Sequence, residues 1–492
     1  MSKSLLVASS VAVLTLSGCF AKVQTLPSHS QSETPVFASI EEPATLVGIA
    51  LSGGGSRAAT FAAGALEALA AYPVKQNAKT VSLLETVTHM SSVSGGSLAT
   101  AYFAMKKPGK EERVLQGSSL SPAYEKFFST FQRDMQMNFQ DRALARQLLF
   151  FRAFNPSKLA YSFAEIWDSH FFHEHTFVSL YEREQRGDTP RIILNGTIYN
   201  TGRRLALTTL GPDDFHYDFA EHLRESFDRR GVKMSPTGRQ EFERSIATAK
   251  KQFMPFTFED LGVDHRTLPI SLAVASSASF PPIVGPVTYW AERGDRYIHV
   301  GDGGLFDNLG TESLTTLFLS KIPNDPQTNR RGLIVVVDSS FPFSAGEESL
   351  NRNTKGFQVF RKDPARIVGI MEARANAYQT MLWQSLRSQD VLLPDYDHLK
   401  IVVLRHIDAQ WERGYEDLPE VCRSRFSNAV TSKQIQAAVS QIPTQFKIED
   451  ECDGALLLQA GRQVVNQQRE LLDRFFHGTK PPEALRHDTS SG

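Results

Sequence analysis

The chain has 492 residues, of which 41% are hydrophobic, and its formal net charge is −1. A chain of this size and apolar content can bury a large core, either as one large α/β domain with extensions or as two ordinary domains. The balanced charge gives no electrostatic footprint for nucleic acid, and no run of lysines or arginines indicates a polybasic membrane patch.

The N-terminus has the pattern of a signal peptide. Lys3 is followed by an apolar stretch over residues 5–16, which is too short for a mature membrane span. The next residues complete the sequence Leu16-Ser17-Gly18-Cys19, which resembles the lipobox of bacterial lipoproteins and implies cleavage before Cys19 and acylation of that cysteine. Phe20 follows, in place of the aspartate associated with inner-membrane retention. We therefore expect a lipid-anchored protein of the bacterial cell envelope, in the outer membrane. An ordinary secretory signal with an accidental cysteine is the alternative.

The composition divides the chain into five expected segments. Residues 1–18 form the signal peptide, and residues 19–44, rich in Ser, Gln, Thr and Pro, form a flexible tether. The main core covers 45–345, with a polar helical excursion near 212–255. An α/β extension packed on the core covers 346–477, and a disordered tail covers 478–492.

From residue 46 onward, strand-like apolar runs alternate with helical patterns. Strands are expected at 46–51, 85–93, 191–199, 203–209, 296–300, 333–338 and 399–404. Helices are expected at 58–72, 97–105, within 122–175, at 270–277, at 364–387 and in the region up to residue 476. This order predicts a mainly parallel sheet with helices on both faces.

Ser94 lies where one of these strands ends in two glycines and a helix begins. Such a turn is typical of a nucleophile elbow, which exposes a serine hydroxyl at the end of a strand. The elbow requires small residues two before and two after the nucleophile, and Ser92 and Gly96 are both small. The following helix directs its positive N-terminal end toward the serine oxygen.

The glycine triplet Gly53-Gly54-Gly55 also stands between a strand and a helix. Successive backbone N–H groups in such a turn can converge on an anion, which beside Ser94 would be the oxyanion of a tetrahedral intermediate. The same residues match the dinucleotide pattern Gly-x-Gly-x-x-Ala, with Glu85 as a conceivable ribose acceptor. We prefer the oxyanion interpretation because a cofactor fingerprint explains neither Ser94 nor the motif described next.

Asp302 begins the sequence Asp302-Gly303-Gly304 after a strand-like run. The two glycines leave its carboxylate uncrowded, although Asp-Gly is also a common turn. Together with Ser94, Asp302 supplies the base that a serine nucleophile requires. These three motifs predict a serine acyl hydrolase that needs no metal and no cofactor.

The motifs, in this order, resemble those of patatin-like phospholipases. The resemblance covers about 46–340 and rests on Gly53-Gly54-Gly55-Ser56-Arg57, Ser92-Val93-Ser94-Gly95-Gly96, Ala275-Ser276-Ser277-Ala278-Ser279-Phe280-Pro281-Pro282, and Asp302-Gly303-Gly304-Leu305-Phe306-Asp307-Asn308. One departure is Ser92, which replaces the first glycine of the usual Gly-x-Ser-x-Gly.

The resemblance implies a three-layer α/β/α fold with a mainly parallel central sheet and helical insertions. It further implies a Ser94–Asp302 dyad, an oxyanion hole from the glycine loop 53–55, and support from Gly95. Arg57 would steady the loop or contact a lipid phosphate. The implied activity is that of a carboxylic ester hydrolase that acts on phospholipids or other acyl lipids through an acyl-enzyme.

Two alternatives stay open at this point. One is a Ser-His-Asp esterase or thioesterase that uses one of the thirteen histidines, with His89, His299 and His406 placed best. The other is a catalytically silent lipid-binding or assembly lipoprotein. Head-group, positional and chain-length preferences are not encoded in these motifs.

Other polar and aromatic clusters are weaker candidates. Asp168, His170, His173, Glu174 and His175 could bind a metal, but their spacing matches no standard zinc pattern and the interleaved phenylalanines favour a packed helix end. The phenylalanines from Phe127 through Phe172 could line an acyl groove, but core packing is their commoner fate. We give no weight to the glycosylation sequon at Asn195, because it lies in a strand-like run.

With Cys19 acylated, only Cys422 and Cys452 remain. An exported chain passes through an oxidising compartment, so we expect these two to form one disulfide. Two separate buried thiols are the alternative.

Overall fold

The computed structural model describes residues 22–29, 34–76, 79–149, 156–217, 233–281, 283–292, 295–322, 330–340 and 399–477, with the single residues 224, 231, 375 and 377. The expected signal peptide with Cys19, the expected helix at 364–387, apart from 375 and 377, and the expected tail at 478–492 lie outside these residues. Among the described residues, no helix is both long and apolar enough to cross a membrane.

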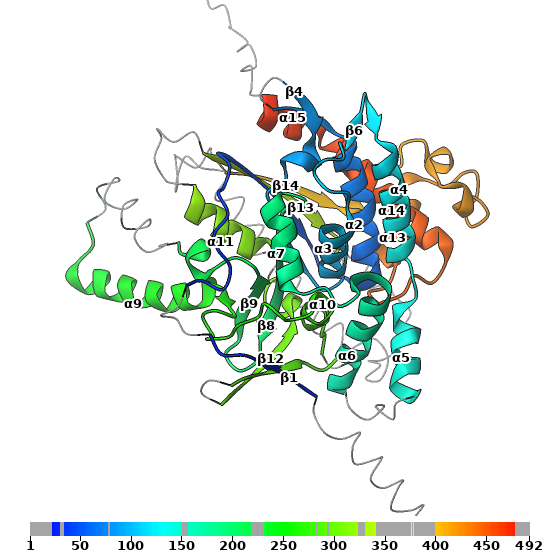
Figure 1. Ribbon diagram of the computed structural model, residues 1–492. Helices are drawn as coiled ribbons and strands as arrows, with labels where there is room; N and C mark the ends of the chain where they lie inside the picture. The colour runs from blue at the N-terminus through cyan, green and yellow to red at the C-terminus, as the bar shows by residue number, and fades with distance from the viewer. Residues whose placement is uncertain are drawn as a thin grey trace, which may run out of the picture.

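One large sheet forms the centre of the molecule (Figure 1). Its main path runs in the order β1-β11-β12-β8-β5-β2-β13-β14. The strands are β1 (Val23–Leu26), β2 (Thr45–Leu51), β5 (His89–Val93), β8 (Arg191–Ile198), β11 (Val287–Ala291), β12 (Arg296–Asp302), β13 (Arg331–Asp338) and β14 (Leu399–Arg405). The five central neighbours from β8 to β14 are all parallel, whereas β12 runs antiparallel to β8 and to β11. Two further strands, β9 (Arg203–Thr208) and β10 (Phe256–Thr257), continue from β8.

Apolar side chains cover both faces of this sheet. In β2, Leu46 and Ala50 belong to one buried cluster, while Val47, Ile49 and Leu51 belong to another. Strands buried on both faces have nearly continuous apolar sequences, which is the pattern of central parallel strands. The two clusters make three layers, as the sequence predicts, and the expected α/β/α class is confirmed.

Helices pack against each face (Figure 1). On one side lie α2 (Gly55–Ala70), α3 (Gly95–Lys106) and α14 (Glu451–Gln467), whose apolar residues join the larger cluster. On the other side α11 (Thr311–Lys321) contributes Leu314, Leu317 and Phe318 to the smaller cluster. A Cβ added to Gly64 would lie 2.3 Å from the Leu458 carbonyl oxygen, so glycine allows α2 and α14 to approach closely.

The remaining elements surround this frame. They are the helices α4 (Pro122–Met135), α5 (Phe139–Leu149), α6 (Pro156–Trp167), α7 (Phe177–Arg186), α9 (Pro236–Phe253), α10 (Ile270–Ser277), α13 (Ser432–Gln441) and α15 (Arg469–His477), and the small hairpins β3 (Pro73–Gln76) with β4 (Lys79–Ser82) and β6 (Leu115–Gln116) with β7 (Ser119–Leu120). The expected excursion at 212–255 contains α9, and its described part begins with a short 3₁₀ turn at Pro212–Phe215.

Two local expectations are wrong. The strand expected at 85–93 begins only at His89, because Leu83–Thr86 forms a 3₁₀ turn. Glu85 closes a capping box there, accepting a hydrogen bond from the Ser82 N–H at 2.7 Å. Its carboxylate thus caps a turn, and the possible role of Glu85 as a ribose acceptor finds no support.

The expected tether at 19–44 is also partly ordered. Val23–Leu26 forms β1, which lies parallel beside β11 at the edge of the sheet. Main-chain hydrogen bonds can hold an edge strand of mixed polarity, and Leu26 anchors it by full burial. The sequence also gives no expectation for β11, which pairs with β12.

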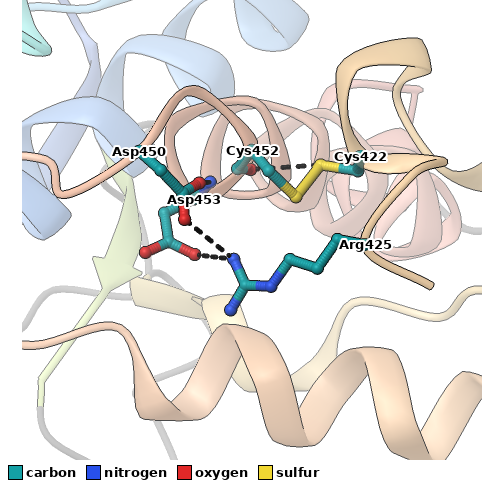
Figure 2. Close-up of a disulfide and its surroundings, with 5 residues drawn as sticks. All are labelled: Cys422, Arg425, Asp450, Cys452 and Asp453. Carbon is teal, nitrogen blue, oxygen red and sulfur yellow. Dashed lines mark hydrogen bonds and ion pairs between the residues drawn. A yellow bond between two sulfur atoms is a disulfide. The ribbon is translucent and has the colours of Figure 1, made fainter.

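The C-terminal extension is built into the core. Its strand β14 extends the sheet beside β13, and α14 packs on α2. A disulfide joins Cys422 to Cys452 at the start of α14, as Figure 2 shows. Beside it, Arg425 forms ion pairs with Asp450 and Asp453. These bonds fasten the loop before α13 to the N-terminus of α14.

Candidate active site

Ser94 occupies a strained turn between β5 and α3. Its backbone φ is +53°, which few residues other than glycine adopt. A Cβ added to Gly95 would lie 2.0 Å from the Gly55 carbonyl oxygen, and one added to Gly96 would lie 2.5 Å from the Leu51 carbonyl oxygen. Only glycines therefore allow the elbow to fit against the neighbouring strand and loop, and strain of this kind concentrates at functional sites.

A network of buried hydroxyl groups supports the elbow. The Ser94 N–H donates to Ser277 Oγ at 3.1 Å, and Ser277 Oγ in turn donates to the Asn195 carbonyl at 2.5 Å. The Ser97 hydroxyl lies 2.8 Å from Ser277 Oγ and donates to Ser92 Oγ at 3.2 Å. Ser92, the departure from glycine, is thus a partner in this network, and its side chain fits the elbow.

Asp302 ends β12 and lies across β8 from the elbow. Asp302 is paired with Gly196 on β8, and the preceding residue of β8, Asn195, is paired with Val93, next to Ser94. The Asp302 N–H donates to the Ser279 carbonyl at 3.0 Å, and its own carbonyl accepts from Thr197 Oγ1 at 2.8 Å. The main chain of Asp302 is therefore fixed on both sides.

The Asp302 carboxylate is buried and has few partners. Burial raises its pKa to about 7, against the opposing effects of hydrogen bonds from the Gly304 N–H and the Ser94 hydroxyl. The Gly304 N–H reaches Oδ1 at 2.8 Å. Among the described residues, the buried Oδ2 forms no hydrogen bond, and the Ser94 hydroxyl is near enough to the carboxylate to lower its pKa. The structure thus brings the Ser94 hydroxyl close to the Asp302 carboxylate.

The glycine loop lies directly beside the elbow. Gly54 and Gly55 have φ values of +140° and +62°, and α2 begins at Gly55. Gly53 differs from them, because its N–H donates to the Asn308 carbonyl at 2.9 Å. Within the described part of the chain, the N–H groups of Gly54 and Gly55 donate a hydrogen bond to no protein acceptor. These two groups, at a helix N-terminus, are placed to receive an anion.

Arg57 is buried beneath this loop. Its Nη2 donates to the Ser339 carbonyl at 2.8 Å and its Nη1 to the Ile442 carbonyl at 3.0 Å. The side chain is 1% exposed. Of the two roles expected for Arg57, support of the loop agrees with these contacts, whereas contact with a lipid phosphate would require exposure.

The three histidines placed best for a triad lie elsewhere. His89 lies five residues before Ser94 on β5, about 16 Å along a strand, with its Nε2 3.2 Å from Glu42 Oε1. His299 Nδ1 lies 2.9 Å from Thr288 Oγ1 on the neighbouring strand. His406 follows β14, three strands and so about 14 Å from β5. Burial lowers the pKa of His406 to about 3. No described histidine forms a hydrogen bond with Ser94.

The sequence motifs do not indicate the roles of three residues of the site. Asn195 donates from Nδ2 to Ser91 Oγ and to the Ser92 carbonyl, at 2.8 and 2.9 Å. In the sequence, Asn195 stands in a glycosylation sequon, which does not indicate this role. Ser277 belongs to the motif that begins at Ala275, but it is 183 residues from Ser94 in the sequence. Asn308 ends the Asp302 motif, and its contact with Gly53 depends on the sheet order.

The remaining candidate clusters have ordinary structural surroundings. In the cluster at 168–175, His170 Nε2 lies 2.7 Å from Arg142, and Asp168 accepts from the Glu174 N–H. In the described part of the chain, no group of three His, Cys, Asp or Glu side chains could hold a metal. Within that part, the phenylalanines between 127 and 172 are buried in the larger apolar cluster, so they pack the core.

Several solved structures are similar to the chain at low sequence identity. Human GIVD cytosolic phospholipase A2 is 14% identical, with a TM-score of 0.43, covering 88% of this chain and 59% of that one. A second structure of the human enzyme is 12% identical, with a TM-score of 0.45 and coverage of 88% and 60%. VipD from Legionella pneumophila is 11% identical, with a TM-score of 0.29 and coverage of 92% and 71%. The chain thus spans less than two thirds of the human enzyme.

No curated protein sequence is significantly similar to the chain. The family model of patatin-like phospholipases, however, matches residues 49–315, more than half of the chain. The matched range contains the glycine loop, Ser94 and Asp302. The chain therefore belongs to the patatin-like phospholipase family.

Proposed function

We propose that the protein is a serine hydrolase that cleaves acyl esters of glycerolipids with Ser94 as nucleophile and Asp302 as base. The observation that carries this proposal is a serine in a strained elbow near a buried carboxylate, one oxygen of which has no hydrogen-bond partner among the described residues and the pKa of which burial raises to about 7. Such a pKa suits a general base near neutral pH, because the group is then ionised yet still basic enough to accept a proton.

The first half-reaction would form an acyl-enzyme. Asp302 Oδ2 takes the proton of the Ser94 hydroxyl as Oγ attacks the ester carbonyl carbon. The carbonyl oxygen becomes an oxyanion, which the N–H groups of Gly54 and Gly55 would stabilise together with the N-terminus of α2. We assign no such role to Gly53, because its N–H is already bonded to Asn308. Collapse of the intermediate breaks the ester C–O bond, and the leaving alcohol takes the proton from Asp302.

The second half-reaction would release the fatty acid. Asp302 removes a proton from a water molecule, which attacks the acyl carbon of the Ser94 ester. The same oxyanion contacts serve again, and the proton returns from Asp302 to Ser94 Oγ. No histidine takes part in this scheme.

The test is active-site labelling combined with product analysis. A fluorophosphonate probe should label the wild-type protein and should not label Ser94→Ala. The purified protein should release fatty acid from phospholipid vesicles, and lipid-class analysis would identify which acyl ester it prefers. A folded protein that neither reacts with the probe nor releases fatty acid would instead be a silent binding or assembly protein.

We further propose that acylated Cys19 anchors the enzyme in the bacterial outer membrane, where its lipid substrates lie. The acyl chains on such an N-terminus supply most of the membrane affinity of the protein. Cys19→Ser should therefore move the protein from the membrane fraction to a soluble or unprocessed form. Unchanged fractionation, or a mature N-terminus other than Cys19, would contradict the anchor.

A further inference from the structure

A segment far from the matched family range contacts the glycine loop. This segment, residues 442–450, connects α13 to α14 and is called here the α13–α14 segment. The Ser56 N–H donates to the Gln445 carbonyl at 2.8 Å, and a parallel β-bridge joins Gly55 to Gln445. A Cβ added to Gly55 would lie 2.4 Å from the Gln445 carbonyl oxygen. The backbone of Gln445 therefore lies directly against Gly55.

The elbow confines Gly55 from another side. A Cβ on Gly95 would lie 2.0 Å from the Gly55 carbonyl oxygen. Gly55 is thus held between Gln445 and Gly95, through backbone contacts alone. Because Gly55 carries one of the proposed oxyanion donors, the position of the α13–α14 segment sets the position of that donor relative to Ser94.

The segment is fixed along its length. Its first carbonyl, at Ile442, accepts from Arg57 Nη1 at 3.0 Å. The Phe446 carbonyl accepts from the N–H groups of Phe139 and Gln140, both at 2.9 Å. The Phe446 ring also packs against aromatic residues of α6, with its centroid 4.9 Å from that of Phe163.

The disulfide fixes the far end of the segment (Figure 2). Asp450 caps α14 by accepting from the Asp453 N–H at 2.9 Å, and Cys452 in the first turn is bonded to Cys422. Arg425 adds ion pairs to Asp450 at 3.3 Å and to Asp453 at 2.6 Å. The covalent bond is therefore seven residues from Gln445, and it holds the helix start from which the segment leads back to the glycine loop.

We propose that the α13–α14 segment is a positioning element for the oxyanion hole and that the Cys422–Cys452 disulfide holds it in its active position. This inference rests on the proposed hydrolase function. It makes full activity depend on oxidation of the two cysteines, as occurs in an exported protein. The enzyme would therefore be slow before export and reach its full rate when the disulfide has formed.

The first test is the double variant Cys422→Ala/Cys452→Ala in the full-length protein. Oxyanion donors act on the transition state, and small displacements of positioning groups are costly, so kcat should fall about tenfold while KM changes by less than about twofold. A matched control is Tyr72→Phe, which removes a 2.5 Å hydrogen bond to Asp473 on α15 and lies away from the segment. This control should lower the melting temperature but leave kcat unchanged.

The second test uses the wild-type protein and does not depend on folding of the variant. A dithiol such as dithiothreitol reduces the disulfide to two thiols and is itself oxidised to a cyclic disulfide. We expect kcat to fall about tenfold while the circular dichroism spectrum is kept, and to recover on reoxidation.

Three results would overturn the inference. They are an unchanged kcat after reduction, a loss of activity that accompanies global unfolding, and an equal loss of kcat in Tyr72→Phe. In each of these cases hydrolysis by the oxidised wild-type protein, absent in Ser94→Ala, would leave the proposed function standing. If the oxidised wild-type protein neither hydrolyses esters nor reacts with fluorophosphonate, the proposed function fails as well.

Discussion

Two buried carboxylates lie near opposite ends of β8, and burial raises the pKa of each to about 7. Asp302 lies at the carboxyl end of β12, beside Ser94. Glu184 lies on α7, near the start of β8, where it borders a cavity of about 370 Å³. Judged by pKa alone, both would be candidate catalytic groups.

Their partners distinguish them. Glu184 has its Oε2 3.5 Å from Arg191 Nε and accepts from Thr209 Oγ1, while its Oε1 accepts from the Ile192 N–H at 3.0 Å. Both of its oxygens are thus occupied by structural groups, including a cation. One Asp302 oxygen accepts from the Gly304 N–H, and the other has no hydrogen-bond partner among the described residues. The Ser94 hydroxyl lies near this carboxylate, and no cation in the described part of the chain contributes to its pKa. A perturbed pKa is therefore a better sign of a functional carboxylate when one of its oxygens is left without a structural partner.

The largest expected effect tests this distinction directly. Ser94→Ala and Asp302→Ala should each abolish hydrolysis in a folded protein, because each removes a group that takes part in bond formation. Glu184→Gln should leave kcat unchanged but lower the melting temperature, since it breaks a buried ion pair and leaves Arg191 without its partner. Steady-state kinetics and thermal unfolding of the three variants would decide. A loss of kcat in Glu184→Gln equal to that in Asp302→Ala would refute the comparison.

A second prediction concerns the glycine loop beside Asp302. Gly55→Val should reduce the rate on the order of a hundredfold or more, because a side chain would clash with Gln445 and disfavour the φ of +62°. Gly202 has nearly the same φ, +66°, but an added Cβ there meets no atom within 4 Å. Gly202→Val is therefore the matched control for backbone strain without displacement of an oxyanion donor, and it should keep normal turnover. Near-normal turnover in Gly55→Val would remove the oxyanion assignment.

The raised pKa of Asp302 predicts how the rate depends on pH. The base acts only when it is deprotonated, so kcat/KM should rise about tenfold per pH unit below pH 7 and level off above it. The folded-state pKa of about 7 exceeds the ordinary value of 3.8, so stability should decline as the pH rises between these values. Asp302→Asn should lose this decline. A pH-rate profile with its midpoint below pH 5, or a decline unchanged in Asp302→Asn, would contradict the assignment.

The sequence predicts those parts of the site in which the relevant residues are neighbours in the chain. The elbow around Ser94, the glycine loop and the Asp302 turn are each local, because a strand end, a glycine and a helix start follow one another. The central strands β2, β13 and β14 are likewise evident from their continuous apolar runs.

The contacts between these motifs are not local, and the sequence could not give them. Ser277 supports Ser94 and Asn308 contacts Gly53 only because the strand order brings their ends together. Gln445 lies in a polar loop whose sequence shows no sign of chemistry, and its contribution is a backbone carbonyl. Glu85 is the converse case, because its capping pattern with Ser82 is local but adjoins an apolar run that predicts a strand.

The smallest expected effect concerns the histidines, and it tests whether Asp302 acts directly on Ser94. In a Ser-His-Asp site the loss of the histidine costs several powers of ten in rate. His89 and His299 contact Glu42 and Thr288, and His406 packs against Phe61 with its Nδ1 3.3 Å from the Asp338 carbonyl. The glutamine variants of these three histidines should each keep at least about a tenth of wild-type activity, any loss reflecting packing.

His406→Gln is the most demanding test of this prediction, because that side chain is buried beside Arg57, which supports the glycine loop. If one variant falls to the level of Ser94→Ala while its circular dichroism and melting temperature stay normal, Asp302 cannot be the sole base. Asp302 would then differ from Glu184 only in acting on the Ser94 proton through a histidine.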